Sequence, residues 1–442
     1  MRHWRGSRGL LLPALAVVLI GALLAAGCGL SGPGGRTAAA GIGPEPEGPG
    51  YEVDLDNDVA AALNRMGLRL YRQLAAQEGN GGGDDEGDDG GGLFISPASI
   101  AMALAMTYNG ARGETQAAMA QALSLEGLDL DTINESYYAL IEELAAAADP
   151  EAGVQLRIAN GIWHRQGVDF YEDFLDRNRQ FYGAAVETAD FDDPATVDAI
   201  NGWVSDMTEG RVTELLEEIR DDSVMFLINA LYFKGNWTDP FDPSHTRPMP
   251  FNGGPEILMM FREGEMAHFK GEGFEAVRLP YGEEGRLAMY VFVPDEESGL
   301  DAFTAALTYD NWKEWQAGFA EKVGRVGLPR FRLAYETKLN DALKAMGMEI
   351  AFDRLRADFS GMRPVSPGNN LFIGDVLHET FLQVDEEGSE AAGATSVEIR
   401  EESALIPDFE LVADRPFFVA IQDDVTGVLL FAGAVTDPQP VK

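Results

Sequence analysis

The stretch of sequence that decides the fold covers residues 386–407 and begins Glu386-Glu387-Gly388-Ser389-Glu390-Ala391-Ala392-Gly393-Ala394-Thr395. Small side chains dominate this first part, and β-branched and charged residues follow it. Small side chains at alternate positions let a segment slide between two existing strands, and β-branched residues then suit a strand. The residues therefore indicate a loop able to become a strand, and the alternative is an ordinary Ala/Gly-rich surface connection.

This stretch and several motifs elsewhere in the chain resemble those of a known protein family. The stretch from Glu386 to Thr395 resembles the proximal hinge of the serpins, the serine-protease-inhibitor family. Further matches keep the family's order and spacing over about residues 55–438. They include Asn160-Gly161-Ile162-Trp163, Leu227-Ile228-Asn229-Ala230, Asp414-Arg415-Pro416-Phe417-Phe418 and Gly427-Val428-Leu429-Leu430-Phe431-Ala432-Gly433.

The resemblance implies an α+β fold with three β-sheets, about eight to nine helices and an exposed reactive-centre loop. The pattern of the residues alone predicts a mixed α and β protein as well. Apolar strand-like runs at 226–233, 288–293 and 428–435 alternate with helical stretches at 98–108, 114–123, 134–147 and 338–346.

The function implied by the resemblance is suicide inhibition of a protease. A target protease attacks the loop and forms an acyl-enzyme, and the cleaved loop then inserts into the central sheet. The hinge favours an inhibitory member, because no proline, arginine or bulky residue lies on the face formed by Ser389, Ala391, Gly393 and Thr395. The alternative is a non-inhibitory binding or carrier protein with the serpin fold.

The usual inhibitory spacing, counted from Gly388, places the reactive bond between Glu402 and Ser403. An acidic bait residue predicts a protease with a basic specificity pocket, such as a glutamyl endopeptidase. Two alternatives remain, Arg400 for trypsin-like targets and Leu405 for chymotrypsin-like or elastase-like targets. A papain-like cysteine protease is a further alternative partner.

The resemblance also assigns residues that control the opening of the central sheet. It places Ser96, Ser99, Asn229 and His378 in the "shutter", where the central strands part, and Trp237 in the "breach". Taken alone, a serine at position 96 is a natural helix N-cap, and a lone histidine is most often a satisfied core or surface residue.

The N-terminal part is expected to be a targeting and tethering region. Residues 1–28 combine a basic start with an apolar run, as in a signal peptide. Ala25-Ala26-Gly27-Cys28 resembles a bacterial lipobox, although Ala25 replaces the usual leucine. Cys28 is then the lipidated residue that anchors the protein to the membrane or surface outside the cytoplasm, and the alternative is a secreted protein. Residues 29–52 are expected to form a flexible Gly/Pro linker before a serpin domain at 53–442.

Within that domain, residues 79–92 form an acidic Gly-rich insert without an apolar side chain. Such a composition cannot support a packed core and predicts a disordered spacer, which we favour over a calcium-binding tract.

Charge and motif content exclude several classes of function. The chain carries 73 acidic and 33 basic residues, a net charge of −40, which repels nucleic acid and leaves membrane contact to a lipid anchor alone. Cys28 is the only cysteine, and the five histidines show no ligand spacing, so neither a metal nor another cofactor is expected. No catalytic motif occurs, and we expect a monomeric inhibitor rather than an enzyme.

Overall fold

The computed structural model describes residues 45–79, 91–365, 370–389 and 407–441. The predicted signal peptide with Cys28, most of the linker and of the acidic insert, and the loop at 390–406 lie outside the described residues. The predictions for the hinge residues from Glu390 to Thr395 and for the reactive bond at Arg400, Glu402, Ser403 or Leu405 therefore stay predictions.

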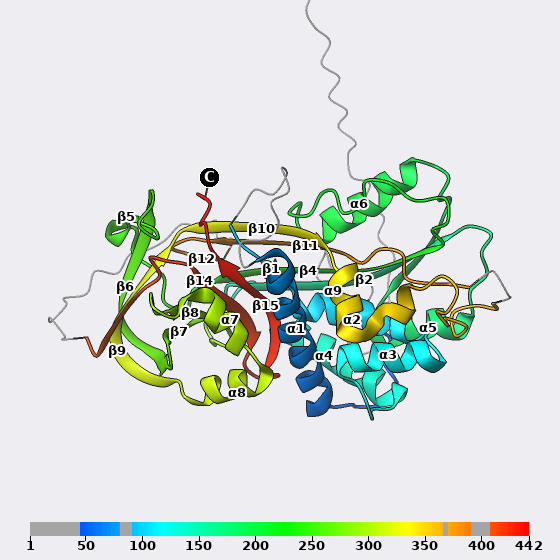
Figure 1. The fold of residues 1–442 in the computed structure, drawn as a ribbon, viewed down its shortest axis with the longest axis horizontal. Coiled ribbons are helices and arrows are strands. Elements are labelled where there is room, and N and C mark those ends of the chain that lie inside the picture. The colour runs from blue at the N-terminus through cyan, green and yellow to red at the C-terminus, as the bar shows by residue number, and fades with distance from the viewer. Residues whose placement is uncertain (1–44, 80–90, 366–369, 390–406, 442) are drawn as a thin grey trace, which may run out of the picture. The chain divides into compact units, whose positions relative to one another are not determined.

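The sheet that contains the hinge has six strands in the order β10-β11-β12-β4-β2-β3 (Figure 1). Only β2 and β3 are parallel, and all other neighbours are antiparallel. The bounds are β10 (Phe331–Lys338), β11 (Leu377–Val384), β12 (Gly388–Ser389), β4 (Met225–Asn236), β2 (Val154–Arg165) and β3 (Ala185–Ala189).

The second hydrogen-bonded sheet has nine strands and falls into two parts. Strand β6 pairs with β5 and β9 over most of its length and with β7 only at its end. The first part contains β5 (Arg247–Pro250), β6 (Glu256–Gly271), β9 (Ala320–Pro329) and β13 (Phe409–Val412). The second contains β7 (Phe274–Tyr281), β8 (Leu287–Pro294), β14 (Phe417–Asp423), β15 (Val428–Val435) and β1 (Phe94–Ile95). With the six-stranded sheet these parts give the three sheets that were predicted.

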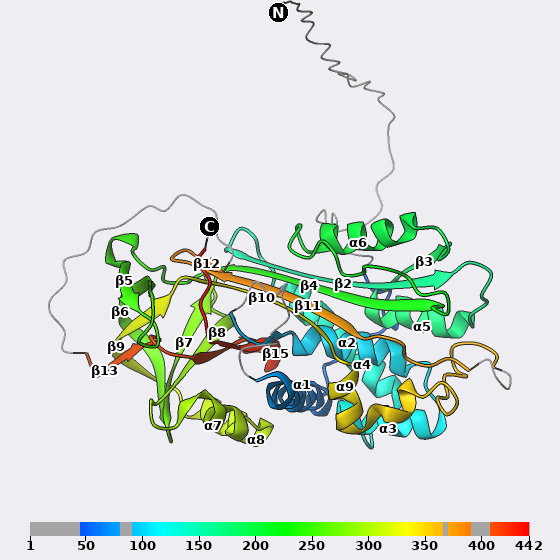
Figure 2. The same cartoon turned by 45° about the horizontal axis from the view of Figure 1, so that its top comes forward.

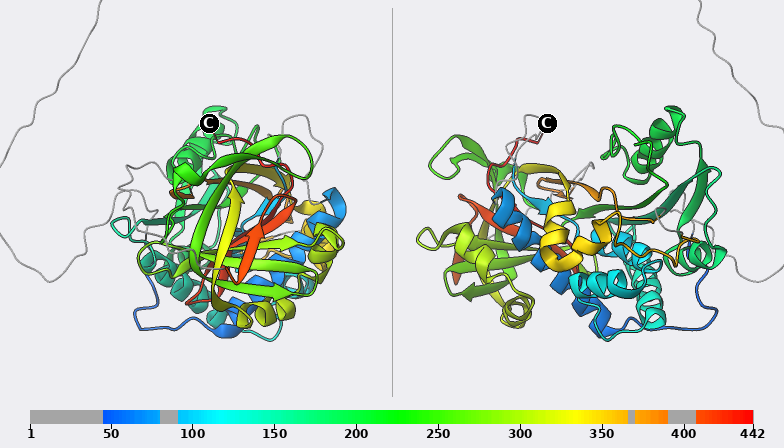
Figure 3. Two further views of the ribbon diagram at one scale, coloured as in Figure 1. Left: turned by 90° about the vertical axis from the view of Figure 1, so that its left-hand side faces the viewer. Right: turned by 45° about the vertical axis from the view of Figure 1, so that its right-hand side comes forward.

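Nine α-helices occur in the described residues, in agreement with the predicted number. Helix α2 contacts β4 on one face of the six-stranded sheet, and α6 covers the other face of β2 and β4 (Figure 2). Figure 3 (left) looks onto the end of the fold where the green to yellow strands β5 to β9 lie in front of the helices. The helices are α1 (Asn57–Glu78), α2 (Pro97–Tyr108), α3 (Gly113–Leu123), α4 (Leu130–Ala146), α5 (Glu172–Tyr182), α6 (Ala195–Met207), α7 (Gly299–Ala306), α8 (Tyr309–Ala317) and α9 (Asn340–Leu343).

Helix α2 lies between the two sheets, where it contacts both β4 and β15. Every residue of α2 except Ala103 is buried, as expected for a helix that is apolar all round. The Ser96 side chain accepts a hydrogen bond from the backbone N–H of Ser99 at 3.2 Å, and Pro97 starts the helix. The predicted N-cap is therefore confirmed, and it fixes the position of two of the predicted shutter serines.

The ends of the predicted linker and insert that fall within the described residues pack on the domain. The Gly48 backbone N–H donates to the Gln180 carbonyl at 2.9 Å. Gly91 and Gly92 are buried, and a Cβ on Gly92 would lie 1.9 Å from the Ala434 carbonyl oxygen. No helix among the described residues is both long enough and apolar enough to span a membrane.

Candidate functional site: an open slot in the six-stranded sheet

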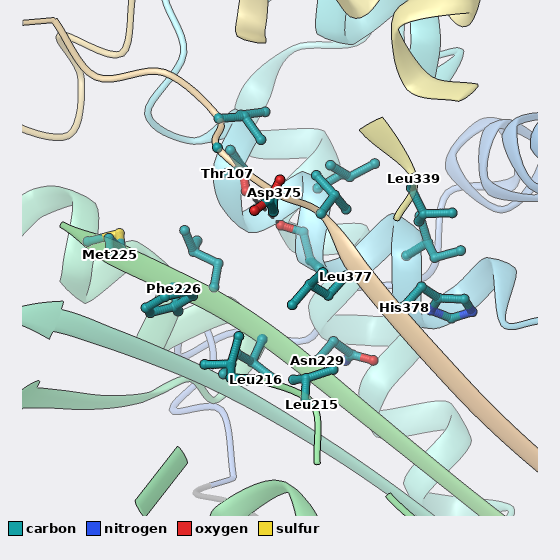
Figure 4. Close-up of a pocket in the computed structure, with 18 of the residues that line it drawn as sticks. Thr107, Leu215, Leu216, Met225, Phe226, Asn229, Leu339, Asp375, Leu377 and His378 are labelled. Atoms are coloured by element: carbon teal, nitrogen blue, oxygen red, sulfur yellow. Dashed lines mark hydrogen bonds between the residues drawn. The ribbon is translucent and has the colours of Figure 1, made fainter. Parts of the chain in front are cut away.

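The six-stranded sheet is incomplete between β4 and β11. Strand β12 has two residues, whereas its neighbours β4 and β11 have twelve and eight. Gly388 and Ser389 pair with Asn236 and Gly235 of β4, and Ser389 also pairs with Val384 of β11. Beyond Ser389, the two facing strands line a cavity of about 1090 Å³ (Figure 4). The sheet therefore offers room for a further strand that continues β12.

The hinge is held at the entrance of this slot by aromatic side chains. Trp237 donates its indole N–H to the Asp385 carbonyl at 2.9 Å, and its ring stacks on Tyr281 at 4.5 Å. The hydroxyl groups of Tyr281 and Ser389 lie 2.7 Å apart, and both residues are buried. A Cβ on Gly388 would lie 2.0 Å from the Gly235 carbonyl oxygen, so only glycine fits there. Trp237, predicted at the breach, thus lies beside the point where β12 enters the sheet.

A buried ion pair supports the hinge from the other side. Glu386 is 4% exposed, and Arg330 donates to its carboxylate at 2.6 Å. The Thr246 hydroxyl donates to the same carboxylate oxygen. A buried carboxylate needs such partners, because removing one of them leaves an uncompensated charge. Sequence reasoning identified Glu386 as a hinge residue but missed Arg330 and Thr246.

Two of the predicted shutter residues connect β11 to the start of α2. The Ser96 backbone N–H donates to Nε2 of His378 at 3.0 Å, and the Ser96 hydroxyl donates to the Leu430 carbonyl at 2.7 Å. Burial lowers the pKa of His378 to about 3. The imidazole is therefore neutral at physiological pH and can accept the Ser96 hydrogen bond, which a protonated ring could not do.

The other two shutter residues lie on the β4 side of the slot. The Ser99 hydroxyl is 3.5 Å from the Asn229 carbonyl, and the Asn229 amide donates to Oδ1 of Asn160 at 2.8 Å. Oδ1 of Asn229 is buried and has no hydrogen-bond partner among the described residues. Figure 4 shows Asn229 and His378 on the two facing strands. The structure thus brings all four predicted shutter residues to the cavity, and the hydrogen bond from the Ser99 backbone N–H to the Ser96 hydroxyl joins the two groups.

An acidic residue that sequence reasoning missed also lines the slot. Burial raises the pKa of Glu379 to about 7, with smaller contributions from the negative charges of Glu336 and Glu214. Glu379 on β11 lies directly opposite Glu336 on β10. The sequence contains no signal for this pair, because the two residues meet only once the strand register is known.

The groups that line the site make hydrogen bonds and packing contacts. No group of three or more His, Cys, Asp or Glu residues in the described part of the chain is arranged to hold a metal ion. The chemistry that this geometry supports is conformational: the slot can accept a strand, and the hinge leads into it.

Comparison with known proteins assigns the chain to a family. A family model described as "Serpin (serine protease inhibitor)" matches residues 61–438. Human Serpin B8 is 37% identical over 361 residues, which cover 78% of this chain and 93% of that protein. The bovine leukocyte elastase inhibitor is 35% identical over 364 residues, again 78% and 93% of the two chains. This chain therefore belongs to the serpin family.

A solved structure agrees with this assignment. The native-state crystal structure of tengpin, a thermophilic serpin, matches with a TM-score of 0.76 at 30% identity. The match covers 89% of this chain and 97% of tengpin. The family and the fold class predicted from the hinge and the C-terminal motifs are thus confirmed.

Proposed function

We propose that this serpin inhibits a serine protease by trapping it as a covalent acyl-enzyme. The single observation that carries the proposal is the slot between β4 and β11, whose entrance is already occupied by the hinge residues Gly388 and Ser389. The serine hydroxyl of the protease attacks the carbonyl carbon of the bait residue, and the peptide bond breaks with release of the new amino terminus. The acyl ester then links the protease to the hinge side of the loop.

Insertion of the cleaved loop carries the protease away from the hinge. The residues from Ser389 to Glu402 would span about 46 Å as a strand, at about 3.3 Å per residue. Strand β4, which would become the neighbour of the inserted loop, has twelve residues. A loop of this length could pair along the whole of β4 on one side and along the eight residues of β11 on the other.

The proposed reactive bond joins Glu402 and Ser403, and the proposed partner is a glutamyl-specific protease. Cleavage after Arg400 by a trypsin-like protease, or after Leu405 by a chymotrypsin-like protease, is the alternative. A panel of these three protease types together with a papain-like protease tests the assignment. Mass spectrometry of the released C-terminal fragment identifies the bond, because a fragment that begins at Ser403 supports Glu402 as the bait residue.

The decisive assay tests whether the intact protein and a panel protease form a complex that survives SDS. A covalent complex at nearly one molecule of protein per molecule of protease supports inhibition. Cleavage by every protease without such a complex, and without a rise in thermal stability, would contradict the proposal and support the alternative of a non-inhibitory carrier.

We further propose that the protein acts outside the cytoplasm, anchored through a lipid on Cys28. The support is the lipobox-like motif that ends the apolar N-terminal run. A Cys28→Ser variant should move from the membrane fraction to the soluble fraction, and labelling with a radioactive fatty acid should disappear. A variant that remains in the membrane fraction would overturn the anchor.

A further inference from the structure

A small pocket beside strand β5 differs in charge from the rest of the molecule. It has a volume of about 200 Å³ and lies among β5, β6 and β9. In a chain with a net charge of −40, the pocket contains three arginines and one histidine but a single carboxylate. The lining residues are Ser244, His245, Arg247, Phe261, Arg262, Glu263 and Arg325.

Two of these arginines converge on one aromatic ring. The guanidinium carbons of Arg247 and Arg325 lie 4.2 and 4.5 Å from the centroid of Phe261, which is 4% exposed. Arg247 pairs with Met259 of β6 and Arg325 pairs with Glu263 of β6. Because alternate residues of a strand share a face, both arginines lie on the same face of the sheet as Phe261. Both guanidinium groups therefore contact one ring, and they reach it from opposite sides of β6, because β5 and β9 flank this strand.

The positive charges of this pair are incompletely balanced. Within the part of the chain that the structure describes, Arg247 has neither a hydrogen bond nor an ion pair. Nε of Arg325 is buried without a hydrogen-bond partner there. The carboxylates nearest to Arg325 are those of Glu263 at 3.7 Å and Glu410 at 3.4 Å, and both side chains are more than half exposed. Such distant, solvated partners screen a guanidinium only weakly.

The third arginine, Arg262, follows Phe261 directly in β6, so its side chain lies on the opposite face of the sheet and contacts Phe241. The side chain of Arg262 is 11% exposed, and burial lowers the pKa of its guanidinium. The carboxylate of Asp239 offsets this effect, but it lies 3.7 Å away and is itself 67% exposed. An anion in the pocket would therefore be held by Arg247 and Arg325 rather than by Arg262.

We propose that this pocket binds one oxyanion group, a carboxylate, sulfate or phosphate, held mainly by Arg247 and Arg325. The planar guanidinium fork matches the oxygens of such a group, and an anion would give Arg247 the charged partner that it lacks among the described residues. The source is either a free anion or a carboxylate on a protein docked at the reactive loop. A protein docked at the loop could reach the pocket, because the two are close along the chain. Arg325 pairs with Glu410 of β13, and the described chain resumes after the loop at Pro407, just before β13.

The binding test uses sulfate as the probe and the purified protein without its signal peptide. Sodium sulfate is titrated against sodium chloride at constant ionic strength, so that general screening cancels. We expect a saturable rise of the melting temperature and saturable heat in calorimetry with sulfate but not with chloride. Arg247→Gln should weaken sulfate binding about tenfold, the effect of losing one charge-assisted hydrogen bond.

The matched control is Arg356→Gln, which removes an exposed arginine whose carboxylate partner Glu114 is 3.9 Å away. This control should bind sulfate like the wild type. Because Arg247 is exposed, Arg247→Gln should also keep the wild-type melting temperature in chloride. Equal sulfate binding by wild type, Arg247→Gln and Arg356→Gln, or no sulfate binding by any of them, would overturn the site.

A second experiment distinguishes the two sources of the anion and rests on the proposed inhibitory function. The association rate with a trapped protease is measured with and without saturating sulfate. If sulfate and Arg247→Gln each slow association and their effects are not additive, the natural occupant is a carboxylate of the protease. If sulfate binds but leaves the rate unchanged, the occupant is a free anion. Failure to trap any protease would contradict the inhibitory function and leave the sulfate result unaffected.

Discussion

The two sheets of this molecule differ in how completely their strands are paired. In the nine-stranded sheet, β8, β14 and β15 are buried at every position, and each has a partner strand on both sides. In the six-stranded sheet, β4 and β11 share a partner of only two residues and face a cavity. The cavity is lined by the half-buried Glu379 and by Asn229, whose amide oxygen has no hydrogen-bond partner within the described chain. The comparison shows that the strands of one sheet are fully paired, whereas the other sheet leaves room for a further strand.

Cutting the reactive loop should have the largest effect on this difference. Insertion of the loop would add a row of backbone hydrogen bonds, each worth about 1 kcal/mol, and raise the melting temperature by on the order of 10 °C or more. Differential scanning calorimetry of intact and nicked protein measures the shift. Equal melting temperatures of intact and nicked protein would show that cleavage of the loop adds no stability.

The next largest effect is expected from a charge on the inserting face. The Ser389 hydroxyl meets the buried Tyr281, so Thr395 would face the core in a strand that continues β12, whereas Ala394 would face the opposite side. Thr395→Arg should lower the fraction of protease trapped by at least about tenfold, because burying an unpaired guanidinium is costly. Ala394→Arg is the matched control. A gel assay of covalent complex against cleaved protein compares the two, and equal loss of trapping would refute the assigned faces.

Acid should reduce the stability of the folded protein through His378. Its folded pKa of about 3 lies below the usual 6.5, so the unfolded chain binds more protons at intermediate pH. Stability is therefore lost as the pH falls below 6.5, by about 2 kcal/mol at pH 5. Urea unfolding of wild type and His378→Gln at several pH values isolates this contribution. If the two proteins show the same pH dependence, the neutral histidine has no such role.

A pair of tyrosine variants makes the comparison of the two sheets direct. Tyr281→Phe removes the hydroxyl that contacts Ser389 in the slot, and Tyr290→Phe removes one that donates to Asp424 in the nine-stranded sheet. Each should reduce stability by about 1 kcal/mol. Only Tyr281→Phe should change the rate of loop insertion, measured by a fluorophore on the hinge during protease trapping. An equal change of rate in Tyr290→Phe would remove the distinction between the sheets.

The smallest expected effect concerns Glu379. Its folded pKa of about 7 lies above the usual 4.5, so the folded protein binds the proton more tightly and gains stability as the pH falls from 8 towards 6.5. The side chain is partly exposed, and solvent screening should keep the gain below about 1 kcal/mol. Glu379→Gln should remove the gain in thermal melts between pH 6.5 and 8. A gain of the same size in that variant would assign it to other groups.

Much of the fold could be predicted because local motifs carry it. The Ser96 N-cap and the apolar strand runs are properties of short segments, and the structure places them as expected. The partners of the hinge could not be predicted in the same way. Tyr281 lies 108 residues before Ser389, and Arg330 lies 56 residues before Glu386. Such contacts depend on the register of strands from both sheets, which no local pattern specifies.

The hydroxyl contact between Tyr281 and Ser389 also sets the register of any strand that continues β12. Strand side chains alternate with a period of two, so the first paired residue dictates the direction of every later one. Adding one residue directly after Ser389 would therefore turn Glu390 inward and Ala391, Gly393 and Thr395 outward. Adding one residue after the proposed reactive bond would leave the register of the inserted strand unchanged, since that segment does not insert.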